Sequence, residues 1–93
     1  MTEAARILMN LEEHANLFHL ALLDKEHPAE LKAALFVERI RELRALECGL
    51  TPGLVEEIWQ GIPTLRDAFA GTLALALAAI VRRDVMLLRA AVA

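Results

Sequence analysis

Hydrophobic and polar residues alternate along the first part of the chain with the period of an amphipathic helix. The apolar positions recur at alternating steps of three and four residues: Ala4, Leu8, Leu11, Ala15, Phe18 and Leu22. Ile7, Leu17 and Ala21 are expected to widen this stripe. Thr2 precedes it and carries the hydroxyl that favours a helix N-cap. The pattern therefore predicts a helix from about Thr2 to Leu23 with one buried face.

A second helix is predicted from about Pro28 to Cys48. Pro28 suits the first helical position, because its missing N–H costs nothing there. Gly49 suits the residue after a helix, where glycine adopts the left-handed conformation easily. The expected inner face consists of Leu31, Leu35, Phe36, Ile40, Leu43 and Leu46. The outer face is charged and offers the i,i+3 pairs Glu38/Arg41, Arg39/Glu42 and Arg44/Glu47.

Two more helices are predicted in the second half of the chain. Thr51 and Pro52 have the residue types of an N-cap and a first helical position, so a short third helix is expected from Pro52 to Gln60, ending at Gly61. Thr64 and Asp67 stand at capping-box spacing. We therefore expect the fourth helix to begin at Leu65 and to extend to Arg82 at least, and to Ala91 at most.

The fourth helix contains the least polar stretch of the chain. Residues 68–81 carry no charge, and Thr72 provides the only polar side chain among them. A helix that is apolar around its whole circumference has to be surrounded by its own protein, by a partner or by lipid. The stretch is shorter than the roughly 20 residues that cross a bilayer, so no membrane span is expected.

Four helices in 93 residues predict an all-α fold, a small four-helix bundle forming a single domain over residues 1–93. Hydrophobic residues make up 57% of the chain, which exceeds the roughly 45–50% of typical soluble domains. Leu and Ala dominate, and both favour helices. Because a small domain has a limited core, the surplus predicts association with a second copy or with another protein.

Small and bulky residues form two neighbouring ridges on the fourth helix. Alanines at i,i+4 spacing permit close helix approach, and the leucines beside them fill grooves. These ridges are expected either to bind a partner or to form the core of a monomer. Trp59 is expected to be either an exposed anchor or a lid over the core. The predicted partner-binding residues are Ala70, Leu73, Ala74, Leu77, Ala78 and Trp59.

Charge and cysteine content narrow the function classes. Residues 1–50 contain six basic and nine acidic residues, and residues 51–93 contain four of each, so no basic tract is present for nucleic acid. The single Cys48 cannot form an intramolecular disulfide, which is typical of a reducing, cytoplasmic protein. The Ala, Leu and Arg usage is compatible with a GC-rich bacterium or its phage as the source.

The spacing of the histidine, acidic and hydroxyl residues gives little support for metal binding or catalysis. Glu12 and His19 share a helix face, but one histidine with one carboxylate is a weak site, and His14 and His19 are five residues apart and point in different directions. The chain has no serine, and none of its threonines lies beside a histidine. We therefore expect no enzyme activity, no metal and no cofactor. The roles of His14, His19 and His27 stay open.

The sequence thus favours a non-catalytic protein–protein interaction module: a small adaptor, a chaperone-like subunit or an inhibitor. It is expected to act as a homodimer or to accept a partner helix, through apolar surfaces of the helix at residues 64–91. The alternative is a small helical metal- or ligand-binding protein that uses Glu12, His19 and their neighbours.

Overall fold

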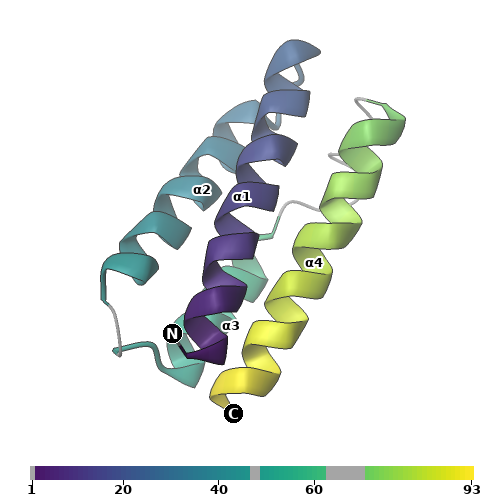
Figure 1. The fold of residues 1–93 in the computed structure, drawn as a ribbon. Helices are drawn as coiled ribbons and strands as arrows, with labels where there is room; N and C mark the ends of the chain where they lie inside the picture. The colour runs from purple at the N-terminus through teal and green to yellow at the C-terminus, as the bar shows by residue number, and fades with distance from the viewer. Residues whose placement is uncertain (1, 47–48, 63–70) are drawn as a thin grey trace.

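The computed structural model describes residues 2–46, 49–62 and 71–93. Within these residues the chain forms four α-helices and no strand, which confirms the predicted all-α bundle. The helices are α1 (Glu3–Asp24), α2 (Glu30–Ala45), α3 (Pro52–Gly61) and α4 (Thr72–Val92). Helix α1 lies between α2 and α4, and the shorter α3 lies at the end of the bundle that holds both termini (Figure 1).

Helix α1 follows the sequence prediction closely. The Thr2 hydroxyl accepts a hydrogen bond from the backbone N–H of Ala5 at 3.1 Å, which caps the helix as expected. Five of the six residues in the predicted apolar stripe are buried, and Ala4 is half-buried against the core. Ile7 joins them, whereas Leu17 is exposed. Because α1 packs against both of the other long helices, it is the central helix of the bundle.

Helix α2 is shorter than predicted and buries a different face. It begins at Glu30 because Pro28 and Ala29 form a turn, in which the Ala29 N–H donates to Nδ1 of His27 at 3.0 Å. It ends at Ala45, so Gly49 is not the residue that terminates it. Three residues of the predicted inner face are exposed instead: Leu31 at 70%, Leu35 at 71% and Leu46 at 50%.

The buried face of α2 is centred on smaller side chains. Ala33 and Val37 are buried together with the correctly predicted Phe36, Ile40 and Leu43. Polar contacts with α1 accompany this buried face, in which Glu30 bonds His19 and Arg44 bonds Glu12. The opposite face of α2, with its leucines, is exposed to solvent.

Ion pairs cover the outer surface of α2. The predicted pairs Glu38/Arg41 and Arg39/Glu42 are present at 2.7 and 2.8 Å. Arg39 also reaches Glu57 on α3 at 3.3 Å. The hydrogen bond to Glu42, together with the charge of Glu57, raises the pKa of Arg39 above its ordinary value. The third predicted pair was Arg44 with Glu47, and Glu47 lies outside the described residues.

Helix α4 begins later than predicted. Gly71, which directly precedes it, has φ 140° and ψ 175°, so a continuous helix from Leu65 through this residue is ruled out. That conformation is open essentially to glycine alone. The predicted capping residues Thr64 and Asp67 lie outside the described residues. At the other end α4 reaches Val92, close to the expected limit of Ala91.

One hydrophobic cluster joins all four helices. Its largest fully buried side chains include Phe18 and Leu11 from α1, Ile40 from α2, Ile58 from α3 and Leu88 from α4. None of the helices in the described ranges is long and apolar enough to cross a membrane.

Candidate association surface

Helix α4 buries one side and leaves a largely apolar side in solvent. Its buried positions recur along one stripe: Ala74, Leu77, Ala78, Val81, Asp84, Val85 and Leu88. The outward side carries Leu73 at 67% exposure and Ile80 at 37%. Among the exposed residues of α4, only Thr72, Arg82 and Arg83 are polar, and residues 72–81 carry no charge. An exposed helix face normally bears charged residues, so this side of α4 is unusual.

The outward apolar positions have a regular spacing. Exposed residues occur at 73, 76, 80, 83, 87 and 90, in alternating steps of three and four residues. These steps place them on one edge of the helix. Five of the six are apolar: Leu73, Ala76, Ile80, Leu87 and Ala90. Arg83 is the exception.

A hydrogen bond fixes the register of α4 against α1. Nδ1 of His14 lies 2.6 Å from Oδ2 of Asp84. Asp24 at the end of α1 and Ala74 at the start of α4 line the same hollow, so the two helices run antiparallel. In this register Leu17, one turn after His14, lies at the level of Ile80, one turn before Asp84.

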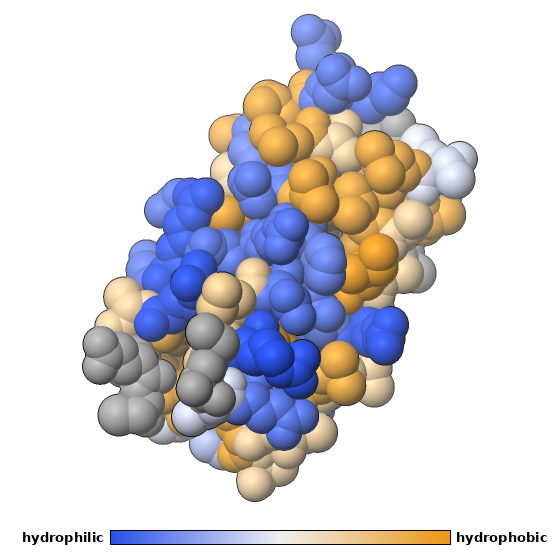
Figure 2. All heavy atoms as spheres, in the orientation of Figure 1, coloured by the Kyte–Doolittle hydropathy of each residue, from blue (hydrophilic) through white to orange (hydrophobic). Residues whose placement is uncertain are grey.

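Two of the exposed leucines of α1 lie at the same end of the bundle as the first half of α4. Leu17 is 45% exposed and Leu20 is 47% exposed. Figure 2 shows apolar side chains gathered over the end of the molecule formed by the second half of α1 and the first half of α4, whereas polar side chains cover the first half of α1. We name this surface the α1/α4 patch and define it as Leu17, Leu20, Leu73, Ala76 and Ile80.

The predicted partner-binding residues divide between this surface and the core. Leu73 lies in the patch. Ala74, Leu77 and Ala78 are only 2%, 8% and 2% exposed, so they form the core of the single chain, one of the two alternatives left by the sequence. A partner cannot reach them without opening the bundle. Ala70 lies outside the described residues.

Trp59 is covered by arginines from the neighbouring helix. The guanidinium carbon of Arg82 lies 5.0 Å from the ring centroid, and that of Arg89 lies 4.7 Å from it. Both separations suit cation–π contacts. The indole also packs against the core and is only partly exposed. Of the two alternatives for Trp59, these contacts fit a lid over the core, in which the ring packs α3 against α4.

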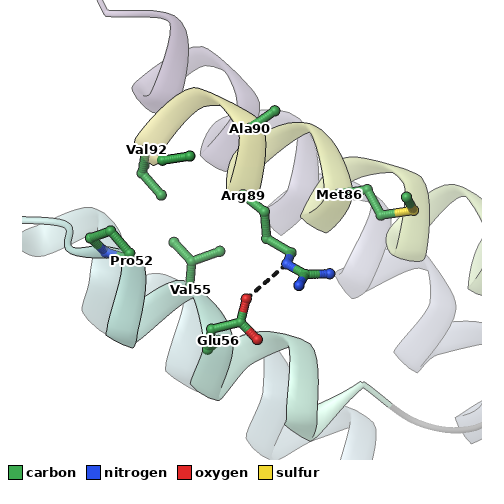
Figure 3. A pocket seen from close by; sticks show the side chains of 8 residues that line it. Pro52, Val55, Glu56, Met86, Arg89, Ala90 and Val92 are labelled. Atoms are coloured by element: carbon green, nitrogen blue, oxygen red, sulfur yellow. Dashed lines mark hydrogen bonds and ion pairs between the residues drawn. The ribbon is translucent and has the colours of Figure 1, made fainter.

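A hollow of about 410 Å³ lies between α3 and the end of α4. Pro52, Val55 and Met86 contribute apolar walls. Nε of Arg89 donates to Oε1 of Glu56 at 2.8 Å across it (Figure 3). Because the two charges neutralise each other, the hollow offers a ligand mainly apolar contacts.

The residues considered for a metal site are held apart. Glu12 accepts from Arg44 at 2.7 Å, and His19 bonds Glu30 at 2.8 Å, so each is paired with a different residue of α2. Among the described residues no group of three or more His, Cys, Asp or Glu is close enough to hold a metal ion.

Sequence reasoning missed most of the α1/α4 patch. It assigned Leu17 to the buried side of α1 and placed the association ridge on the alanines that the core uses. The signal that locates the patch is the pair His14 and Asp84, seventy residues apart, which no local pattern relates. Comparison with known proteins found no match to this chain among family models, curated proteins or solved structures.

Proposed function

We propose that this protein is a non-catalytic association module that binds through the α1/α4 patch, and that its partner is a second copy of the same chain. The observation that supports this most directly is the outward face of α4. Residues 72–81 of this helix bear no charge, although one side of it faces solvent. Contiguous exposed apolar surface of this kind marks association sites in soluble proteins.

The size of the patch is consistent with reversible association. Leu17, Leu20, Leu73 and Ile80 are between 37% and 67% exposed, so about half of each side chain remains to be buried. Covering such half-exposed side chains contributes on the order of 1 kcal/mol each. A two-fold interface uses every side chain twice, so eight such side chains are covered in one dimer, and their gain is opposed by the entropic cost of association. A weak, concentration-dependent dimer is the expected result.

The test compares three chains by sedimentation velocity over a range of protein concentrations. The wild-type chain is expected to shift from monomer to dimer with rising concentration. Leu73→Glu and Ile80→Glu are expected to stay monomeric, because each places a charge in the interface. Both positions are exposed in the monomer, so circular dichroism should show an unchanged helical content.

Leu35→Glu is the matched control. Leu35 is 71% exposed, more than Leu73, but it lies on α2 outside the patch. This variant is expected to dimerise as the wild type does. A wild-type chain that sediments as a monomer at high micromolar concentration would reject self-association, and equal loss of dimer in Leu35→Glu would reject the α1/α4 patch as its site.

A further inference from the structure

Helix α3 is attached to a frame that the three long helices form among themselves. Helix α1 lies between α2 and α4 and packs against both, whereas α3 packs mainly against α4 and to a smaller extent against α2 (Figure 1). Polar contacts also join the long helices directly, from His14 to Asp84 and from His19 to Glu30. The frame of α1, α2 and α4 therefore keeps its own contacts when α3 is absent from it.

The apolar attachment of α3 is small. Only Val55 and Ile58 are buried in this ten-residue helix, whereas seven residues of α4 are buried. A helix of ten residues is marginal in water by itself, so α3 is stable only while it is docked. Among the four helices, α3 is therefore the one whose separate release costs the least free energy.

Opposite charges provide a second attachment. Both charged residues of α3 are acidic, and they face arginines of two different helices. On the α4 side, Oε1 of Glu56 accepts from Nε of Arg89 at 2.8 Å. On the α2 side, Oε1 of Glu57 lies 3.3 Å from a guanidinium nitrogen of Arg39. An acidic helix is thus held between two cationic neighbours.

These ion pairs lie at the surface, where salt can weaken them. The side chain of Glu56 is 49% exposed and that of Glu57 is 60% exposed. An exposed ion pair changes an equilibrium by up to about fivefold, and dissolved salt screens it. Because two such pairs act on one short helix with little buried surface, the docking of α3 depends on ionic strength.

We propose that α3 is a charge-held cover, which leaves the frame as a unit while α1, α2 and α4 stay folded, and that ionic strength controls how often it opens. Opening withdraws Val55 and Ile58 from the shared hydrophobic cluster and exposes apolar surface that the closed chain hides. The proposal is independent of the α1/α4 patch, because α3 contacts the second half of α4.

Hydrogen exchange of the full chain, measured by mass spectrometry, provides the test. Peptides from residues 52–61 report the opening of α3, and peptides from residues 7–22 report the opening of the frame. In the wild type we expect exchange in α3 to be at least about tenfold faster than in α1. Between 10 mM and 1 M NaCl the screening length falls from about 30 Å to about 3 Å. Exchange in α3 is expected to rise about fivefold over this range, whereas exchange in α1 stays unchanged.

The variant Glu56→Gln/Glu57→Gln removes both charges of α3 and keeps its helix propensity. At low salt, exchange in residues 52–61 is expected to be about tenfold faster than in the wild type and to lose most of its salt dependence. Glu38→Gln is the matched control, because it removes a similarly exposed ion pair, that with Arg41, without affecting α3. Its exchange in α3 should equal that of the wild type.

Two results would overturn the proposal. If residues 52–61 of the wild type exchange as slowly as residues 7–22, α3 opens only when the whole chain unfolds. If the double variant and the Glu38→Gln control exchange equally in α3, the charges do not hold this helix in place.

Discussion

Each histidine of this chain has a hydrogen-bond partner within it. His14 joins α1 to α4 through Asp84, His19 joins α1 to α2 through Glu30, and His27 accepts from the backbone before α2. Asp84 is the only charged residue that is buried in the described part of the chain, at 8% exposure. Because a buried carboxylate needs a partner, the pair with His14 selects one register of α4 on α1.

Removal of both members of this pair should cost less than the sum of the two separate removals. We expect His14→Ala to lower the free energy of unfolding by about 1–3 kcal/mol, since it leaves Asp84 buried without its partner. The double variant His14→Ala/Asp84→Ala should lose less than the sum of the single variants. Urea denaturation of all four chains gives the coupling energy. Additive losses would show that the pair does not determine stability.

At the scale of elements, the start of α4 depends on the backbone of one residue. Gly71 occupies a conformation with φ 140° that a residue with a Cβ resists. Nothing lies within 4 Å of a Cβ built at this position, so the cost of a side chain there comes from the backbone alone.

Gly71→Ala is expected to destabilise the protein by about 1–3 kcal/mol through backbone strain. Gly53→Ala is the matched comparison, because Gly53 lies in the first turn of α3 with its nearest contact to a Cβ at 3.9 Å. That variant should be neutral or more stable by up to about 1 kcal/mol. Thermal melts of both variants measure the difference. Equal stability of the two variants would mean that residue 71 relaxes to another conformation.

The sequence predicted which elements form better than how they face one another. The three-four spacing in α1 identified its buried stripe, and Thr2 and Thr51 cap their helices as expected. In α2 the larger leucines suggested the wrong inner face, because a helix with charge on most sides has no clear stripe and its orientation is set by contacts with α1. In α4 an apolar circumference could not show which side meets the neighbouring helices.

At the scale of the whole molecule, α1 is the central helix, and its two flanks are joined to different neighbours. The flank towards α2 is closed by the ion pair of Glu12 with Arg44 and by the hydrogen bond between His19 and Glu30. The flank towards α4 is apolar beyond His14 and continues into the exposed patch. The two flanks of α1 therefore differ, because polar pairs close the flank towards α2 and exposed apolar side chains adjoin the flank towards α4.

Self-association through the α1/α4 patch predicts a stability that depends on protein concentration. A dimer that forms only from folded chains stabilises them by mass action, so the melting temperature of the wild type should rise with concentration. Leu73→Glu should melt at one temperature over the same range. Calorimetry or circular dichroism at several concentrations measures this. A concentration-independent wild-type melt would contradict association of the native state.

The stack of Arg82, Trp59 and Arg89 makes the attachment of α3 visible to spectroscopy. Trp59 is the only tryptophan of the chain, and its ring lies against two cations that belong to α4. Its emission therefore reports whether α3 is docked, while the α1/α4 patch lies on another edge of α4. If this short helix detaches before the rest of the bundle unfolds, a fluorescence transition should precede the loss of helical signal. The fluorescence of Trp59 would then distinguish local opening of α3 from global unfolding, without an added label.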